Sequence, residues 1–265
     1  MKKLLVFLFF VVVLAADSIE IVSWNLLHLS SKTLHKKDSQ FIRQYLRKHD
    51  LIVVEEVLDK KALSSLTTKK VLYSRLSGRK RYKEYIAFVV GGNLSKERLR
   101  VFNYYDTHDT FERDPAMLAI GNNFGIVGVH LIYGKRKHGN VELTKREIRG
   151  LTNILKYFSK KSGIPENRIV VAGDFNLPAS IIRKIVKQKV LIEEGTTVST
   201  SKKRIAAHDY DHFIIPRNMK ARAFVDYEVL QGDLSVKHRK WFRKYVSDHY
   251  PIILTFSICP AISTK

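Results

Sequence analysis

Several apolar runs of this sequence end abruptly in carboxylates, amides or histidines. The segment VAGDFN (171–176) contains Asp174 and Asn176, and VSDHYP (246–251) contains Asp248 and His249. Other runs end in the same way, at Asn25, Glu55, Glu56, His130, Asp211 and His212. A single polar residue at a strand end usually caps or hydrogen-bonds nearby backbone. So many of them together indicate a shared site at one end of several strands.

The residue types define the chemistry that such a site could perform. Carboxylate and amide oxygens are the ligands of a hard divalent cation such as Mg²⁺, which fills the rest of its coordination shell with water and phosphate oxygens. Histidines with acidic partners transfer protons near neutral pH. The combination predicts metal-assisted hydrolysis of a phosphodiester. The histidines could instead bind zinc, but the sequence contains no HExxH or CxxC spacing.

Alternating strands and helices are expected to position these residues. Strand-like apolar runs occur at 19–24, 51–57, 85–90, 116–120, 124–133, 168–175, 212–216 and 251–256. Apolar residues recur at helical spacing between the first two runs and again between Leu143 and Phe158. Because strands outnumber helices and many have short links, the pattern favours a mixed-sheet sandwich flanked by helices over a doubly wound parallel sheet. No GxGxxG motif follows a strand, which argues against the usual nucleotide-cofactor sites.

The N-terminal segment differs in composition from the rest of the chain. Two lysines precede an unbroken apolar run from Leu4 to Leu14, which is followed by Ala15 and Ala16. The run is shorter than the about 20 residues of a spanning helix, and its basic start and small-residue end are typical of a secretory signal. We therefore expect a signal peptide at 1–16, a single domain at 17–265, and a periplasmic or secreted protein without stable membrane association. An uncleaved membrane anchor is the alternative.

Positive charge dominates the composition. The chain has 47 lysine and arginine residues against 25 aspartate and glutamate residues, which gives a net charge of +22. Such a protein is attracted to polyanions, namely nucleic acid, acidic phospholipid or acidic glycans. Basic residues concentrate in four segments that we expect to be loops around the site: 77–83, 133–139, 200–208 and 236–245. Together they would bind phosphates along a nucleic acid with little sequence preference. The single cysteine, Cys259, excludes an internal disulfide.

The ordered motifs SWN, VEEV, VH, GDFN, YDH and SDHYP resemble those of the endonuclease/exonuclease/phosphatase superfamily over residues 19–256. Within the superfamily, the segments at 78–90 and 111–120 are similar to those of deoxyribonuclease I-like nucleases. The resemblance implies an α/β fold, a four-layer α-β-β-α sandwich of two packed mixed β-sheets flanked by helices. It also implies a divalent-metal-dependent endonuclease that acts on DNA, and we expect a monomer.

The resemblance also assigns roles at the metal and at the phosphate. Glu56, Asn25 and Asp248 would hold the metal, Mg²⁺ or in its place Mn²⁺ or Ca²⁺. Asp174 and Asn176 would lie on the scissile phosphate. We expect Glu55 to be a solvated neighbour of Glu56 or to support it from behind.

Two acid–histidine pairs are implied on either side of that phosphate. Glu84 would pair with His130 and Asp211 with His249, so that one histidine takes a proton from water and the other gives one to the leaving oxygen. We expect His249 to be the base and His130 the acid. The residues expected to contact the substrate are Tyr82, Arg113 and His212.

Two other functions are compatible with these residues. A secreted phospholipid phosphodiesterase of the sphingomyelinase type would share the metal and the histidines, but it is expected to expose an apolar or aromatic hairpin, and the loops here are cationic. A non-catalytic polyanion-binding protein on the same scaffold is expected to have lost site residues. None of the expected site residues is missing from the sequence.

Overall fold

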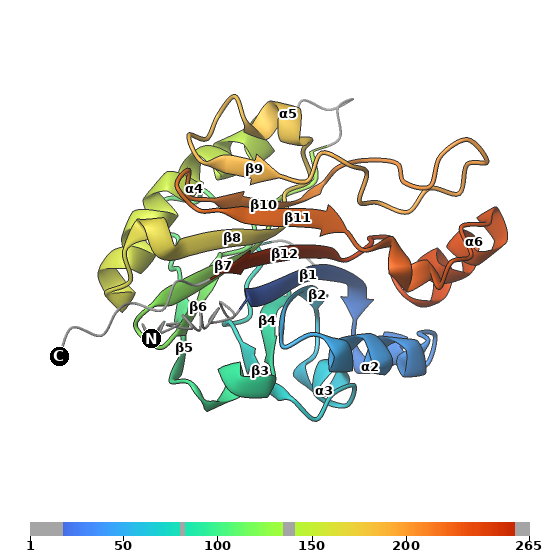
Figure 1. Ribbon diagram of the computed structural model, residues 1–265. Coiled ribbons are helices and arrows are strands. Elements are labelled where there is room, and N and C mark those ends of the chain that lie inside the picture. Colours follow the sequence, from blue (N-terminus) through green and yellow to red (C-terminus); the bar gives the residue numbers. More distant parts are fainter. Residues whose placement is uncertain (1–17, 80–82, 135–140, 258–265) are drawn as a thin grey trace, which may run out of the picture.

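Two six-stranded β-sheets pack face to face in a computed structural model that describes residues 18–79, 83–134 and 141–257 (Figure 1). The first sheet has the strand order β11 (Ala221–Val225), β12 (Ile252–Ser257), β1 (Ser18–Leu29), β2 (Leu51–Val57), β4 (Tyr85–Val90) and β3 (Lys70–Tyr73). The second has the order β5 (Leu99–Asn103), β6 (Ala116–Ile120), β7 (Phe124–His130), β8 (Ile169–Asp174), β10 (Asp211–Ile215) and β9 (Lys189–Leu191).

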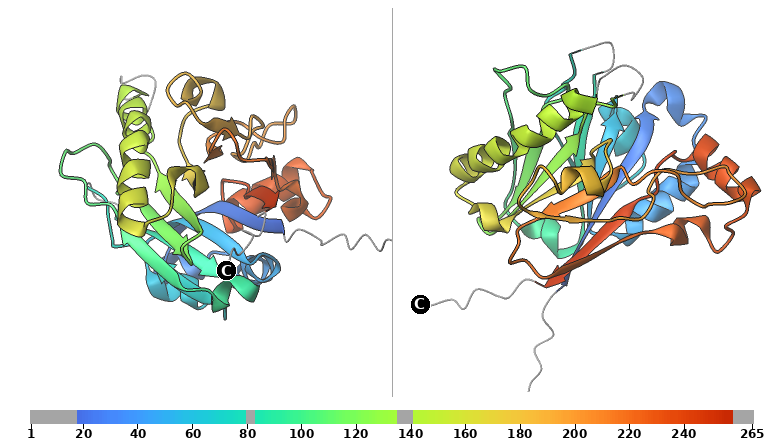
Figure 2. Two further views of the ribbon diagram at one scale, coloured as in Figure 1. Left: turned by 60° about the vertical axis from the view of Figure 1, so that its left-hand side comes forward. Right: turned by 90° about the horizontal axis from the view of Figure 1, so that it is seen from above.

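Helices flank the two sheets, so the expected four-layer sandwich is confirmed (Figures 1 and 2). The α-helices are α1 (Ser31–Leu34), α2 (Ser39–Lys48), α3 (Lys60–Ser64), α4 (Val141–Ser162), α5 (Ala179–Ile182) and α6 (Val236–Tyr245). The short 3₁₀ helices are η1 (Gly92–Lys96), η3 (Glu166–Arg168) and η4 (Tyr227–Leu230). Within the described residues, no helix combines the length and apolar character needed to cross a membrane. The expected signal peptide and Cys259 lie outside the described residues.

The sheets are mixed in the same way. Each contains one parallel pair, β1 with β2 and β7 with β8, and all other neighbours are antiparallel. The parallel pairs lie near the middle of their sheets, and β1, β2, β7 and β8 also contact one another across the interface between the sheets. The ends of these strands therefore come close together, and any polar side chains there share one site.

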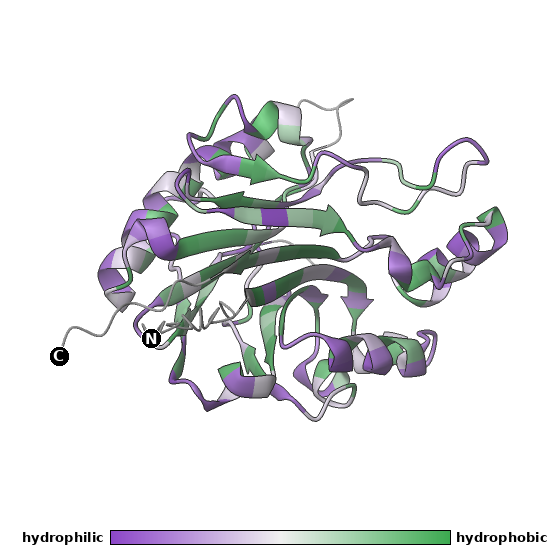
Figure 3. Cartoon of the chain, in the orientation of Figure 1, coloured by the Kyte–Doolittle hydropathy of each residue, from purple (hydrophilic) through white to green (hydrophobic). Residues whose placement is uncertain are grey.

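The alternation of side chains along the central strands builds two cores. In β8, Val170 and Ala172 belong to the core between the sheets, whereas Ile169 and Val171 pack in a second core with residues of α4 such as Leu151. Burying a Val or Ile side chain stabilises a fold by about 1.5–3 kcal/mol. Figure 3 shows the same pattern as hydrophobic strands under helices of mixed hydropathy.

Four strands and the α-helices other than α2 and α4 were not predicted. The missed strands, β3, β5, β9 and β11, are the four edge strands of the two sheets. Their residues are mostly half-exposed, so they lack the apolar runs that mark the buried strands. The segment 236–245 was expected to be a loop but is helix α6, which begins at an N-cap in which Ser235 Oγ accepts the His238 N–H at 3.1 Å.

Candidate active site

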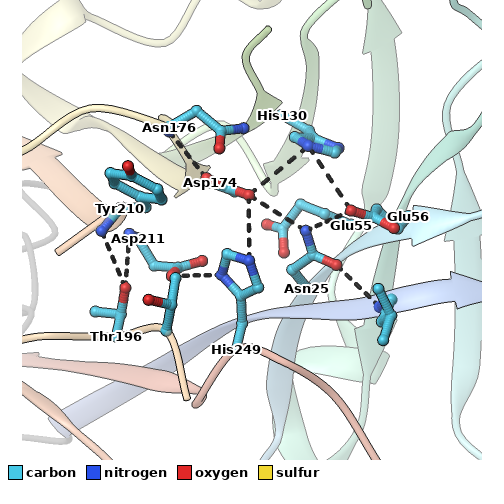
Figure 4. Close-up of polar contacts among 12 residues, drawn as sticks. Asn25, Glu55, Glu56, His130, Asp174, Asn176, Thr196, Tyr210, Asp211 and His249 are labelled. Carbon is cyan, nitrogen blue, oxygen red and sulfur yellow. Dashed lines mark hydrogen bonds and ion pairs between the residues drawn. The ribbon is translucent and has the colours of Figure 1, made fainter. Parts of the chain in front are cut away.

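The site residues expected from the sequence meet at one end of the sandwich (Figure 4). His130 is the last residue of β7 and Asp174 the last of β8, and the parallel register places them opposite each other. Asp211 begins the antiparallel strand β10 and is also paired with Asp174. Asn25 comes from β1 in the other sheet. Side chains from both sheets therefore point toward one another.

Asp174 is the centre of this arrangement. Its Oδ2 lies 3.7 Å from Nε2 of His130, 3.7 Å from Nε2 of His249 and 3.3 Å from Nδ2 of Asn25. The residue is 2% exposed, and burial raises the pKa of Asp174 to about 6. The charge of Asp211 also raises this pKa, whereas the two histidines lower it. A buried carboxylate is costly unless it is hydrogen-bonded or paired with charge; Asn25 donates to Asp174, and the two histidines lie within ion-pair distance.

Each histidine has its own carboxylate on the other side of the ring. Nδ1 of His130 lies 2.8 Å from Oε1 of Glu84, and Nδ1 of His249 lies 2.8 Å from Oδ2 of Asp211. A carboxylate that accepts the Nδ1–H fixes the tautomer, stabilises imidazolium and directs Nε2 at the reacting group. The structure thus brings together both pairs expected from the sequence, with their Nε2 atoms facing each other across Asp174.

The surrounding carboxylates favour the protonated form of both histidines. Burial opposes protonation of His130 and Arg113 adds to that effect, but Glu84 and Asp174 together outweigh both, so the pKa of His130 is raised. Burial also opposes protonation of His249, but Asp211 and Asp174 raise the pKa of His249 well above 6.5. Both histidines are therefore more basic than a free imidazole.

A β-bulge brings Glu56 to the site. The register between β2 and β4 shifts at this point, and Glu56 has a φ of 58°, a left-handed conformation that non-glycine residues rarely adopt. Its Oε1 accepts a hydrogen bond from Nδ2 of Asn25 at 2.9 Å, and its Oε2 accepts one from the His28 N–H at 2.8 Å. Burial would raise the pKa of Glu56, but the His130 and His28 rings and these hydrogen bonds lower it to about 2. Glu56 is thus a carboxylate at any working pH.

Two overlapping groups of side chains have the chemistry to hold a divalent cation. Oxygens of Glu56 and Asp174 converge on Nδ2 of Asn25, at 2.9 and 3.3 Å, so the position between these carboxylates already favours positive charge. Asp174, Asp211 and His249 form a second, buried group, whose ligand atoms all lie within 4.8 Å of one another. Oxygen donors predominate in both groups, which suits Mg²⁺, Mn²⁺ or Ca²⁺ better than zinc.

Asp248, the third expected metal ligand, lies beside this site with a half-buried side chain. Its carbonyl accepts the Val198 N–H at 2.8 Å, which fixes the backbone between Ser247 and His249. The charges of Asp248 and Glu56 both act on the ammonium of Lys37, so the two carboxylates lie on the same side of the site.

The GDFN segment places Asp174 and Asn176 by backbone constraints. Gly173 has a φ of 147°, and a Cβ there would stand 1.9 Å from the carbonyl oxygen of Val129, so only glycine lets β8 approach β7 this closely. Asn176 has a φ of 52°. Its N–H donates to Asp174 Oδ1 at 2.9 Å, and its Nδ2 donates to the Leu131 carbonyl at 2.9 Å. Strained backbone of this kind is characteristic of functional sites.

Two hydrogen bonds join the SDH and SWN segments, and a third lies within SDH. Ser247 Oγ donates to the Asn25 carbonyl at 2.6 Å and accepts the His249 N–H at 3.1 Å. Nε1 of the buried Trp24 donates to the His249 carbonyl at 3.1 Å. These bonds fix the backbone of His249 relative to that of Asn25.

Arg113, expected to contact the substrate, lies against the first pair. Its Nε is 3.1 Å from Oε2 of Glu84, and 17% of its side chain is exposed. Glu147, a buried residue of α4, accepts the N–H groups of Glu112 at 2.6 Å and of Ile132 at 2.7 Å, which holds the Arg113 segment beside the end of β7. Burial raises the pKa of Glu147 to about 7. The position of Arg113 indicates that it orients Glu84.

Two expectations from the sequence were wrong and one falls outside the described residues. His212 was expected to contact the substrate, but it is fully buried, and its ring nitrogens lie 3.0 and 2.9 Å from the carbonyl oxygens of Ile192 and Leu177. Glu55 was expected to be solvated or to support Glu56; the solvated alternative is wrong, because Glu55 is fully buried, and it accepts a hydrogen bond from Ser23 Oγ at 2.8 Å. Tyr82 lies outside the described residues.

Lys37 is a residue at the site that the sequence analysis missed. Its Nζ donates to the carbonyls of Leu26 at 3.0 Å and Val246 at 2.8 Å, and so joins the chain after Asn25 to the chain before Asp248. Burial lowers the pKa of Lys37 to about 8. No feature of the sequence marks Lys37, because it stands in the run HKKDS, which is typical of a solvated surface.

Comparisons with known proteins bear on the family and the fold of the chain. No family model matches the chain. A protein named Deoxyribonuclease from Thioalkalivibrio sp. (strain K90mix) is 26% identical over 277 residues, which cover 91% of this chain and 72% of that protein. Among solved structures, TDP2 from C. elegans matches 91% of this chain and 75% of its own with a TM-score of 0.60 and 15% identity. Sphingomyelinase C from Streptomyces griseocarneus matches 91% of this chain and 100% of its own with a TM-score of 0.57 and 14% identity.

Proposed function

We propose that this chain, which belongs to the endonuclease/exonuclease/phosphatase superfamily, is an exported, divalent-metal-dependent endonuclease that hydrolyses DNA with little sequence preference. The observation that carries the proposal is the arrangement of the two acid–histidine pairs, whose Nε2 atoms both lie 3.7 Å from the same Asp174 oxygen. Phosphodiester hydrolysis requires one proton to leave the attacking water and another to reach the leaving oxygen. Two imidazoles that face one small volume can perform both transfers.

The residues of the chain divide these tasks. His249, whose pKa Asp211 and Asp174 raise, takes the proton of water at Nε2. His130 gives a proton from Nε2 to the leaving oxygen, and Arg113 favours that loss, since its charge lowers the pKa of His130. Asp174 and Asn176 orient the phosphate and the water between the two rings.

Mg²⁺, or in its place Mn²⁺ or Ca²⁺, would be held by Glu56, Asn25 and Asp248 beside Asp174. When bound, it supplies positive charge that stabilises the negative charge developing on the phosphate. The low pKa of Glu56 supports this role, because a metal ligand must be ionised.

DNA is the proposed substrate because of the deoxyribonuclease relative and the positive charge of the chain. A sphingomyelinase-type activity is the second candidate, favoured by the structural match to Sphingomyelinase C. Insertion into lipid needs a cluster of exposed apolar side chains. The exposed large hydrophobic residues of the described chain come instead from separate segments: Leu76, Tyr105, Tyr133, Phe224 and Leu234. A non-catalytic polyanion-binding role is disfavoured because every described residue of the two pairs is in place.

Export, a single domain at 17–265 and a monomeric state are part of the same proposal. The basic start, the apolar run and the small residues of segment 1–16 support export. Mass spectrometry of the protein recovered from the periplasm or medium would detect a new N-terminus after Ala15 or Ala16. A protein that stays in the membrane fraction with residues 1–16 attached would contradict this part.

The activity is tested by incubating the purified protein with plasmid DNA, single-stranded DNA, RNA and sphingomyelin vesicles, each with Mg²⁺ and with chelator. The His249→Ala variant, purified in parallel, controls for contaminating nuclease. We expect internal cuts in plasmid DNA that require metal and His249. Cleavage of sphingomyelin without cleavage of any nucleic acid would contradict the proposal.

A further inference from the structure

One buried arginine joins two basic segments next to the site. Arg239, in α6, is 3% exposed, although it is charged. Its Nη1 donates to the carbonyls of Ser199 and Arg204 at 2.5 Å each, its Nη2 to that of Ser201 at 3.0 Å, and its Nε to that of Leu234 at 3.0 Å. No carboxylate forms an ion pair with it among the described residues. The hydrogen bonds of the guanidinium therefore hold the loop at 199–206 against the helix.

Further contacts make the loop and the helix one unit, which we call the basic arm (residues 199–206 and α6). Ser199 N–H donates to the Ile205 carbonyl at 2.9 Å, and Val198 is bridged to Ala206, which closes the loop on itself. Arg243 Nη1 donates to the Val198 carbonyl at 2.9 Å. Figure 1 shows the loop and α6 projecting together beyond the strand ends.

The arm starts at the active site. Thr197, just before the loop, is bridged to His249, and the Val198 N–H donates to the Asp248 carbonyl at 2.8 Å. The view from above in Figure 2 shows the loop lying over α6. The arm is thus continuous with the residues expected to perform the chemistry.

The outward side chains of the arm are cationic. Lys237, Lys240 and Lys244 are exposed and stand at i, i+3 and i+7, which places them on one face of α6. The loop adds three exposed cations, Lys202, Lys203 and Arg204. Neither 199–206 nor α6 contains an acidic residue.

We propose that the basic arm binds the phosphate backbone of the nucleic acid beyond the scissile bond, and that Arg239 shapes the arm without contacting phosphate. The inference rests on the proposed function. Linear polyanions fit a row of fixed lysines, each of which neutralises one phosphate and releases counterions. An anionic membrane would also be attracted, but of the exposed large hydrophobic residues of the described chain only Leu234 lies next to the arm, so there is little to insert into lipid.

Matched charge-removal variants test the arm. One triple variant changes Lys202, Lys203 and Arg204 to Ala, and a second changes Lys237, Lys240 and Lys244 to Ala. A control changes Lys156, Lys160 and Lys161 to Ala, three exposed residues at the end of α4 that leads toward the start of β8, away from the site. Affinity for a short DNA duplex is measured in chelator over about 50 to 200 mM salt.

Each arm triple should reduce the slope of log affinity against log salt by roughly 2 to 3, since each lost phosphate contact removes about 0.9. The control triple should leave the slope unchanged, and all three variants should keep the cleavage rate at saturating DNA. Equal salt slopes for the arm triples and the control triple would contradict phosphate binding by the basic arm, while leaving the proposed function intact. An arm-dependent affinity for phosphatidylglycerol vesicles without one for DNA would also overturn it. Arm-dependent DNA binding without any cleavage would overturn the proposed function alone.

Arg239→Met tests the shaping role, because it keeps every exposed cation of the arm. We expect weaker DNA affinity, a shallower salt slope, and faster trypsin cleavage at residues 202–204 than in the wild type, with the cleavage rate at saturating DNA kept. Leu151→Ala, a core change in α4, controls for a general loss of stability. If Leu151→Ala shifts the salt slope as much as Arg239→Met, the effect is general destabilisation and Arg239 has no specific role.

Discussion

The Glu84–His130 and Asp211–His249 pairs share the same 2.8 Å contact between Nδ1 and carboxylate but have different neighbours. Glu84 also faces the Arg113 guanidinium, whose charge partly cancels its effect on His130. Asp211 and Asp174 raise the pKa of His249, and Asp174 raises that of His130 as well. One pairing geometry is thus combined with different surrounding charges, which suits the two histidines to the different roles proposed for them.

The carboxylate between the pairs gives the largest expected effect. Asp174→Asn removes the charge that both Nε2 atoms face, so we expect cleavage to fall by about 10³ to 10⁴-fold, the upper part of the range for one acid-base group. Turnover of plasmid DNA at saturating Mg²⁺ measures it. Asp233→Asn, at a surface carboxylate before α6, is the control and should behave as the wild type. A loss of cleavage rate well below about 10³-fold in Asp174→Asn would mean that the two acid–histidine pairs do not both depend on this carboxylate.

Glu56→Gln changes the proposed metal site next to His130, since Oε1 of Glu56 lies 3.9 Å from Nε2 of that histidine. The variant keeps the shape of the side chain but loses the charge that holds metal, so activity should fall by about 10²-fold or more and the Mg²⁺ needed for half-maximal activity should rise. A Mg²⁺ titration of the cleavage rate checks both changes. Unchanged metal dependence would remove Glu56 from the metal site.

The pH dependence should separate the two pairs. If His249 is the base, it must be neutral to act, so activity should rise with pH through its raised pKa. Asp211→Asn should lower that pKa and move the acid limb of the kcat/KM profile to lower pH. Arg113→Met should raise the pKa of His130 and move the alkaline limb to higher pH. The opposite pattern, with Asp211→Asn moving the alkaline limb, would exchange the roles of the two histidines.

The smallest effect on activity is expected at Glu55, the sequence neighbour of Glu56. Burial raises the pKa of Glu55 well above 4.5, so its neutral form stabilises the fold at acidic pH, and stability is lost as pH rises from about 4.5 toward the folded pKa. Glu55→Gln removes this loss, and its stability advantage should grow by up to about 1.4 kcal/mol per pH unit over that window. Urea unfolding at several pH values checks it. An advantage that does not vary with pH would show that Glu55 is ionised in the folded protein.

The same contrast between neighbours explains how far the sequence could predict the structure. The buried strands and the residues at their ends, such as Asp174 and His130, were predictable because apolar runs mark the strands and polar residues interrupt them. The edge strands were not, because half-exposed segments such as 70–73 carry no such pattern. Glu55 and Glu56 differ through a bulge, which moves one side chain to the site. The family resemblance assigned Glu56 to the metal, but the residue pattern of VEEV does not reveal the bulge.

Residues that act through long-range contacts were equally hidden. Lys37 and Glu147 are charged residues within polar or amphipathic segments, and only the folded chain places them against backbone groups of the site. His212 shows the opposite error, since its position in the YDH motif suggested a substrate contact although the ring is buried between carbonyls.

The central claim is that the two histidines perform the chemistry while other residues provide the attraction to DNA. The most direct measurement is the cleavage rate at saturating DNA together with the DNA affinity in chelator, for the wild type, His130→Ala, His249→Ala and the control His35→Ala at the end of α1. The account predicts a loss of about 10² to 10⁴-fold in rate for each site histidine, with affinity largely kept and His35→Ala unchanged. Either site variant cleaving DNA at close to the wild-type rate would contradict it.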